Sequence, residues 1–108
     1  MKFLNKQKGN QGEETAAKYL KANGFKIIAT NFGIKWGEID IIASKENTLS
    51  FVEVKYKSSE IYGSPENMIN VHKIKKIKRV AEAFLEKNKR IASSYDIYRI
   101  DIIAITLL

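Results

Sequence analysis

Cysteine is absent from the sequence, and histidine occurs only once, as His72. Without cysteine the chain can form no disulfide bond, no thiolate nucleophile and no zinc site with cysteine ligands. A metal site built from several histidines is excluded as well. Any metal would therefore be held by carboxylates, whose hard oxygen atoms favour magnesium, manganese or calcium.

Long hydrophobic runs are missing too. No apolar segment approaches the roughly 18 residues that a membrane-spanning helix requires. The N-terminal segment MKFLNKQKGN is basic, but it lacks the apolar core and the small-residue cleavage site of a secretory signal. We therefore expect a cytoplasmic protein without a membrane partner.

Negative charge is in short supply, since 12 acidic residues stand against 19 lysines and arginines and leave a net charge of +7. The length of 108 residues and the hydrophobic fraction of 44% fit one folded domain over residues 1–108. Such an excess of positive charge on a small domain favours a polyanionic partner such as nucleic acid. A lysine-rich surface that only confers solubility is the alternative.

The N-terminal part of the chain predicts a tail and a helix. Residues 1–9 are expected to be a flexible basic tail. Asn10 and Glu13 have the spacing of a capping box, which predicts that the first helix begins there. The helix should continue to about Asn23 and end at Gly24, in the position where glycine commonly terminates helices.

Three strands are predicted next, over residues 25–32, 37–43 and 48–57, and their short connections favour an antiparallel meander. A second helix should begin after Asn70 as its N-cap and run to about residue 88, and a last strand should follow over residues 95–106. Because a helix connects the third strand to the last, these two should be parallel. The order αβββαβ predicts an α/β fold with a mixed four-stranded sheet and a helix on each side.

Charged residues interrupt the most apolar part of the chain. Asp40 lies between two isoleucines, while Glu53 and Lys55 alternate with the apolar residues of the third strand. Ionisable groups are seldom buried unless they are paired or bind a metal. Alternation puts Glu53 and Lys55 on one face of the strand, and Asp40 shares that face if the register allows.

An aspartate on one strand and a Glu-x-Lys on the next is the arrangement of PD-(D/E)xK nucleases. Asp40 and Glu53 would be the metal ligands and would hold magnesium or manganese against a scissile phosphate. Lys55 would reach the attacking water or a phosphate oxygen. A non-catalytic alternative remains open, in which Asp40 is an edge residue and Glu53 and Lys55 form ion pairs on a solvated face.

These segments resemble the small bacterial YraN family, whose members are similar to Holliday-junction resolvases of the restriction-endonuclease-like superfamily. The resemblance covers almost the whole chain in order. The matching segments are GEETAAKYLKANGF at 12–25, GEIDIIA at 37–43, FVEVKYK at 51–57, GSPENMI at 63–69, VHKIKKIKRVAEAFL at 71–85 and RIDIIAI at 99–105.

The resemblance implies the restriction-endonuclease-like αβββαβ core and a site formed by Glu13, Asp40, Glu53 and Lys55. Glu13 would complete the metal site from the first helix, although it could instead serve only as a capping residue. Ile39 replaces the proline of the superfamily's pattern, which is a tolerated departure.

Basic residues at the start of the second helix are candidates for nucleic-acid binding. The resemblance implies a phosphate contact for Lys73. Four further basic residues are expected to contact the nucleic-acid backbone non-specifically, or else to form a solvated helix face: Lys75, Lys76, Lys78 and Arg79. His72 is expected to be an exposed first-turn residue rather than a ligand.

Two further pairs of residues can be interpreted from the sequence. Arg99 and Asp101 share one face of the last strand, which predicts a structural ion pair. Trp36 and Phe32 lie near a turn, where they could stack on unpaired bases. Packing beneath the loop is the interpretation that we favour for both aromatic residues.

Together these features predict a magnesium- or manganese-dependent endonuclease that acts on DNA, including branched or single-stranded DNA. One alternative is a nucleic-acid-binding module on the same fold without catalysis. Another is an adaptor that docks a protein partner through its second helix. A resolvase needs two active sites to cut two strands, so a homodimer is expected if that activity is the right one.

Overall fold

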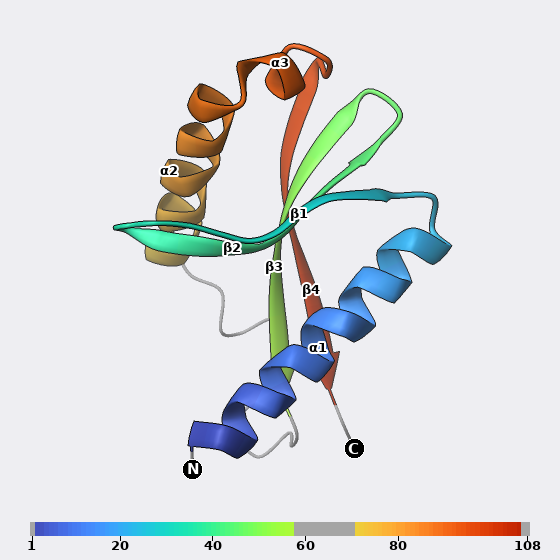
Figure 1. Ribbon diagram of the computed structural model, residues 1–108, viewed down its shortest axis with the longest axis vertical. Helices are drawn as coiled ribbons and strands as arrows, with labels where there is room; N and C mark the ends of the chain where they lie inside the picture. Colours follow the sequence, from blue (N-terminus) through green and yellow to red (C-terminus); the bar gives the residue numbers. More distant parts are fainter. Residues whose placement is uncertain (1, 58–70, 107–108) are drawn as a thin grey trace.

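The fold is a four-stranded sheet with a long helix on each face (Figure 1). The computed structural model describes residues 2–57 and 71–106. Strands β1, β2 and β3 are antiparallel neighbours, and β4 lies at the edge, parallel to β3. The elements are α1 (Lys2–Ala22), β1 (Lys26–Ile34), β2 (Gly37–Lys45), β3 (Thr48–Lys57), α2 (Val71–Lys87), α3 (Lys89–Ala92) and β4 (Ile97–Thr106).

This architecture confirms the predicted αβββαβ order and the mixed sheet, with the short helix α3 as an addition. The crossover through α2 brings β4 back parallel to β3, as such connections require. Helix α2 begins at Val71, and its predicted cap Asn70 lies outside the described residues. The arrangement is compatible with a restriction-endonuclease-like core.

Helix α1 begins at Lys2, well before the predicted start at Asn10. Residues 2–9, which we expected to form a flexible tail, are helical because lysine, glutamine and leucine favour helix. Gly9 and Asn10 each cost at most about 1 kcal/mol in a helix interior, which is too little to end the helix. The predicted capping box is therefore wrong, and Glu13 lies inside the helix.

The other end of α1 follows the prediction. Gly24 adopts a φ of 86°, a left-handed conformation that suits glycine. The N–H of Phe25 donates to the carbonyl oxygen of Leu20 at 2.9 Å, and the N–H of Gly24 donates to that of Lys21 at 3.1 Å. This pair of bonds is a Schellman motif, which satisfies the last carbonyl groups and turns the chain into β1.

Helix α1 is amphipathic. Ala16 and Leu20 are buried against the sheet, whereas Glu14 and Lys18 are exposed. Within residues 2–57 and 71–106, no helix is long and apolar enough to cross a membrane.

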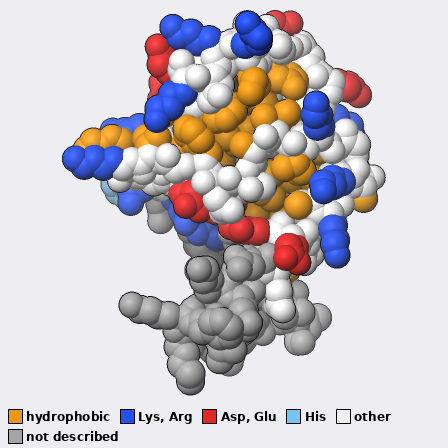
Figure 2. Space-filling model, in the orientation of Figure 1, with side chains coloured by type: hydrophobic (Ala, Val, Ile, Leu, Met, Phe, Trp, Pro, Cys, Tyr) orange, Lys and Arg blue, Asp and Glu red, His pale blue; other side chains and the backbone are white. Residues whose placement is uncertain are grey.

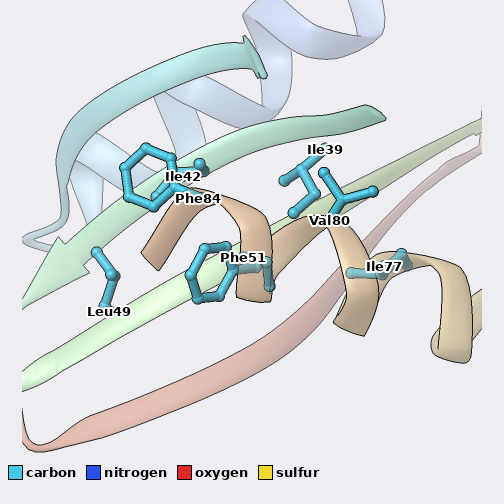
Figure 3. Close-up of a cluster of buried hydrophobic side chains, with 8 residues drawn as sticks. Ile39, Ile42, Leu49, Phe51, Ile77, Val80 and Phe84 are labelled. Atoms are coloured by element: carbon cyan, nitrogen blue, oxygen red, sulfur yellow. The ribbon is translucent and has the colours of Figure 1, made fainter. Parts of the chain in front are cut away.

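Two apolar clusters hold the helices to opposite faces of the sheet. The cluster under α2 contains side chains of β2, β3 and α2 that point toward one another (Figure 3). Its buried members are Ile39, Ile42, Leu49, Phe51, Ile77, Val80, Ala81 and Phe84. The cluster under α1 contains Ala16, Leu20, Ile41, Ala43 and Val52.

The alternation of side chains along β2 breaks at Asp40. Ile41 packs under α1 and Ile42 under α2, as a regular strand requires, but Ile39 also packs under α2. The pairing between β2 and β3 ends at Ile41 and Val52, while β2 stays paired with β1. The two strands therefore separate at Asp40, which opens a gap in the sheet between them.

Candidate active site

Three carboxylates converge where β2 leaves β3. Glu13 comes from α1, and Glu38 and Asp40 come from β2. One oxygen atom of each lies within 4.8 Å of those of the other two. The spacing of two residues puts Glu38 and Asp40 on the same side of their strand. Glu13 reaches the same place from α1.

Asp40 is fixed by the backbone of the neighbouring strand. Its Oδ2 atom accepts a hydrogen bond of 2.7 Å from the N–H of Val54. If the pairing continued, Val54 would face Ile39, and a backbone carbonyl would be the acceptor. The carboxylate takes the place of that carbonyl, so the N–H of Val54 keeps an acceptor where the strands separate.

The sequence left the register of β2 and β3 open. The observed register places Glu53 beside Asp40. Burial raises the pKa of Glu53 to about 7, and a hydrogen bond with Asp40 and its charge act in the same direction. An ion pair with Lys73 on α2, at 3.6 Å, acts against that rise. The carboxyl groups of Asp40 and Glu53 and the ammonium group of Lys73 therefore lie close together in a partly buried place.

Lys55, two residues after Glu53 on β3, lies near Asp40, Glu53 and Lys73. Burial lowers the pKa of Lys55, and the neighbouring ammonium of Lys73 lowers it further, while Glu53 and Asp40 raise it. The lysine therefore holds its proton less tightly than an exposed lysine does. The structure thus brings together all the side chains that the sequence proposed for the site: Glu13, Asp40, Glu53 and Lys55.

Asn31 is a member of this group that sequence reasoning missed. With its amide turned so that the nitrogen faces the carboxylates, it donates to Glu13 Oε1 at 3.0 Å and to Glu38 Oε1 at 3.2 Å. Burial raises the pKa of Glu13, and the charge of Asp40 raises it further. The hydrogen bond from Asn31 to Glu13 lowers it. Asn31 has a φ of 52°, in the left-handed region, which asparagine tolerates better than most residues.

Glu38 was also missed, although the sequence contains a signal for it. Glu38 and Asp40 are separated by one residue in the segment GEIDIIA, so they project from the same side of a strand. Two carboxylates placed in this way form a potential metal-binding pair. Asn31 has no comparable signal, because its contact with Glu13 depends on how α1 crosses β1.

An open pocket of about 460 Å³ adjoins the carboxylates, between the β1–β2 hairpin and the first turns of α2. Acidic side chains gather below this hairpin, and basic side chains lie beside them (Figure 2). The lining residues are Trp36, Gly37, Glu38, Asp40, Glu53, His72, Lys73, Lys76, Ile77 and Val80. The pocket therefore has acidic groups on one side and basic groups on the other.

The residues that the sequence proposed for nucleic-acid binding divide into two groups. Lys73 and Lys76 line the pocket. Lys75, Lys78 and Arg79 are exposed on α2 and do not line it. His72 is exposed in the first turn of α2, as expected, and its side chain reaches the pocket wall.

The predicted ion pair on β4 is present. Arg99 Nε lies 2.8 Å from Asp101 Oδ2, and this oxygen also accepts a hydrogen bond from the Ser50 hydroxyl. The pair lies on the face of the sheet that α1 covers, away from the pocket. It is a structural feature, as the sequence indicated.

The two aromatic residues near the β1–β2 turn behave differently. Phe32 packs in the cluster under α2, with its ring centroid 5.1 Å from that of Phe84 in an edge-to-face arrangement. Trp36 is 56% exposed. Packing was therefore the right interpretation for Phe32 and the wrong one for Trp36.

Comparison with known proteins finds a family model and relatives that cover most of the chain. A model described as "Uncharacterised protein family UPF0102" matches residues 12–105. A UPF0102 protein of Caldicellulosiruptor saccharolyticus is 42% identical over 103 residues, which cover 94% of this chain and 85% of that protein. One from Vibrio campbellii is 40% identical, over 95% of this chain and 84% of its own. One from Clostridium botulinum is 42% identical, over 99% of this chain and 85% of its own.

Proposed function

We propose that this chain, which belongs to the uncharacterised protein family UPF0102, is a metal-dependent endonuclease that hydrolyses phosphodiester bonds of DNA. One observation carries the proposal. At the point where β2 leaves β3, the carboxylates of Glu13, Glu38 and Asp40 lie within 4.8 Å of one another. Glu53 and Lys55 adjoin them from β3.

The donor set suits a hard divalent cation. It consists of carboxylate oxygens, and the chain has no cysteine, so magnesium or manganese fits better than a softer metal. Asp40 and Glu53 are the ligands that the motif predicts, and Glu13 and Glu38 add two more carboxylates. When bound, the ion supplies a Lewis acid that neutralises charge on the phosphoryl oxygens.

The lysines supply the rest of the chemistry. The ammonium of Lys55 lies beside the carboxylates, where it stabilises the negative charge that develops on the phosphate during hydrolysis. Lys73 approaches from α2 and balances Glu53 in the free protein. Lys76, one turn further along α2, lines the same pocket and binds an adjacent phosphate of the DNA.

Cleavage assays test the proposal. The protein is incubated with single-stranded, linear duplex and four-way-junction DNA, with and without magnesium or manganese. We expect metal-dependent cleavage of at least one substrate, and its loss in Asp40→Asn and Lys55→Ala. Matched controls are Glu86→Gln and Lys18→Ala, which change exposed residues away from the pocket and should leave cleavage intact. Cleavage that survives in both site variants would come from a contaminant and would refute the proposal.

A second candidate is a nucleic-acid-binding module that does not cleave. The ion pair between Glu53 and Lys73 favours it, because the charge of one carboxylate of the site is already balanced by a lysine of the chain itself. The net charge of +7 suits either function. Salt-dependent DNA binding without cleavage, in the presence of either metal, would support this candidate.

The substrate has consequences for location and assembly. We include action on DNA within the cytoplasm as part of the proposal. Cutting both strands of a branched substrate requires two such sites, so we include a homodimer on that substrate. Measuring the mass of the complex with a four-way junction tests this part separately.

A further inference from the structure

We propose that Trp36 stacks on an unpaired nucleobase beside the phosphate held in the pocket, so that the protein selects DNA whose bases are accessible. The inference rests on the proposed function in one respect, that the pocket binds DNA. It goes further because it gives a physical basis for a preference for single-stranded DNA or the unpaired positions of branched DNA. It also assigns the selection to one side chain.

The exposure of Trp36 is the first observation. Its side chain is 56% exposed at the turn between β1 and β2. An indole that is packed buries about 150–250 Å² of surface, which stabilises a fold considerably. Phe32 and Ile34, its neighbours on β1, pack against the cluster under α2, and Trp36 belongs to neither cluster of described residues. Part of its aromatic surface is therefore accessible to a ligand.

Its position is the second observation. Trp36 lines the same pocket as Asp40 and Glu53, and Lys73 and Lys76 line the wall formed by α2. The pocket's volume of about 460 Å³ lies within the range of pockets that hold small ligands, about 300–1,000 Å³. A nucleotide whose phosphate lies among the lysines and carboxylates would have its base within reach of the pocket rim.

The surroundings of the indole favour a nucleic acid over a protein partner. Lys35 Nζ lies 5.4 Å from the centroid of the Trp36 ring, so one cation already stacks on the aromatic system. An aromatic surface with basic side chains nearby suits a polyanion that carries flat bases. An acidic or apolar peptide would match only one of these two features.

The preference for unpaired bases follows from stacking itself. In a duplex each base is covered on both faces by its neighbours, so an indole can reach a base only by intercalation. In a single strand or at a branch point a base can leave the stack and expose one face. Stacking is also tolerant of sequence, because every base has a flat aromatic face.

Intrinsic fluorescence provides a direct test, because Trp36 is the only tryptophan in the chain. The wild-type protein is titrated in EDTA with a short single-stranded oligonucleotide. The same titration is made with an abasic oligonucleotide that has equal phosphate content, and with the corresponding duplex. We expect saturable quenching by the single strand and little quenching by the abasic strand or the duplex. Equal quenching by the abasic strand would overturn the proposal.

Binding of labelled oligonucleotides provides the second measurement. We expect Trp36→Ala to weaken single-strand binding roughly 5- to 150-fold, which corresponds to the loss of one stacked base. Trp36→Phe should restore most of the affinity, and both variants should bind the abasic strand like the wild type. The matched control is Tyr19→Ala, which removes another exposed aromatic, one that lines a different pocket, and should change nothing. Unchanged single-strand affinity in Trp36→Ala would refute the proposal.

These outcomes separate the two proposals. The titrations contain no divalent cation and need no cleavage. Base-dependent quenching without cleavage in the metal assays would refute the nuclease and leave the stacking intact. Metal-dependent cleavage without base-dependent quenching would refute the stacking and leave the nuclease intact.

Discussion

Asp40 takes over the role of a backbone acceptor for Val54, with a hydrogen bond of 2.7 Å at the point where β2 and β3 separate. The same carboxylate lies beside Glu13 and Glu38. One side chain therefore both closes the sheet where its pairing ends and contributes to the candidate metal site. Two substitutions separate the structural role of Asp40 from its role in the metal site, because one leaves an acceptor for the N–H of Val54 and the other does not.

We expect Asp40→Asn to retain stability and lose cleavage, because the amide oxygen can still accept from Val54 but is a poor metal ligand. Asp40→Ala should lose cleavage and also reduce the free energy of unfolding by about 1–3 kcal/mol, since the N–H of Val54 is left without an acceptor. Urea denaturation of both variants measures the difference. Equal stability of the two would show that the hydrogen bond contributes nothing.

The raised pKa of Glu53 predicts how stability depends on pH. In the folded protein burial and Asp40 raise this pKa from 4.5 to about 7. The folded state therefore binds a proton between these pH values that the unfolded state has lost. The stabilisation is fully present below pH 4.5 and is lost as the pH rises through 7. We expect the free energy of unfolding to fall between pH 5 and pH 8.

Glu53→Gln removes this group and should flatten the pH dependence. At pH 8 we expect the variant to be more stable than the wild type by about 1 kcal/mol, a value kept small because the carboxyl group is only partly buried. Glu13, whose pKa is also raised, should leave a weaker slope of the same sign. Urea denaturation at several pH values checks this, with the exposed Glu86→Gln as the control. A wild type that gains stability toward pH 8 would contradict it.

Lys75 and Lys76 are neighbours on α2, but only Lys76 lines the pocket. If DNA occupies the pocket, Lys76→Ala should weaken binding and reduce the slope of log affinity against log salt by nearly one, as expected for one phosphate contact. Lys75→Ala should leave the slope almost unchanged. Fluorescence anisotropy over a range of salt concentrations measures both. Equal effects of the two substitutions would indicate diffuse attraction to the helix rather than a contact in the pocket.

Arg79 provides a test of how far DNA extends along α2. It was proposed from the sequence as a backbone contact, but it does not line the pocket. We expect Arg79→Ala to change the salt slope less than Lys76→Ala does. An effect as large as that of Lys76→Ala would mean that the DNA follows the helix beyond the pocket.

The sequence predicted the strand pattern well because alternation and turn lengths are local properties. It also predicted that Glu53 and Lys55 share a face, and the register then brought Asp40 to them. The start of α1 was mispredicted because Asn10 and Glu13 have capping-box spacing by coincidence, and helix propensity upstream of them prevails.

The remaining features depend on tertiary geometry that no local pattern encodes. The break in alternation between Ile39 and Ile41 exists because β2 leaves β3 there. Glu13 of α1 meets Glu38 beside that separation. Trp36 was expected to pack because large aromatics usually do, and nothing in its sequence context shows that the hairpin turn leaves it exposed.

Asn31 allows the backbone and the side-chain contributions at the site to be measured separately. Asn31→Gly keeps access to the left-handed conformation at φ 52° but removes the amide that donates to Glu13 and Glu38. Because that hydrogen bond lowers the pKa of Glu13, its pKa should rise in the glycine variant, which carboxyl NMR can measure. If Glu13 binds the metal, cleavage should then require a higher magnesium concentration.

Asn31→Ala should show the same rise in the pKa of Glu13 and an additional loss of stability. A side chain in the left-handed region costs roughly 1–2 kcal/mol when it cannot form the local contacts that asparagine can. We therefore expect the alanine variant to be less stable than the glycine variant by about 1 kcal/mol, while both have the same metal requirement. A metal requirement that follows stability instead would mean that Asn31 acts only through the backbone, and that its amide does not position the carboxylates.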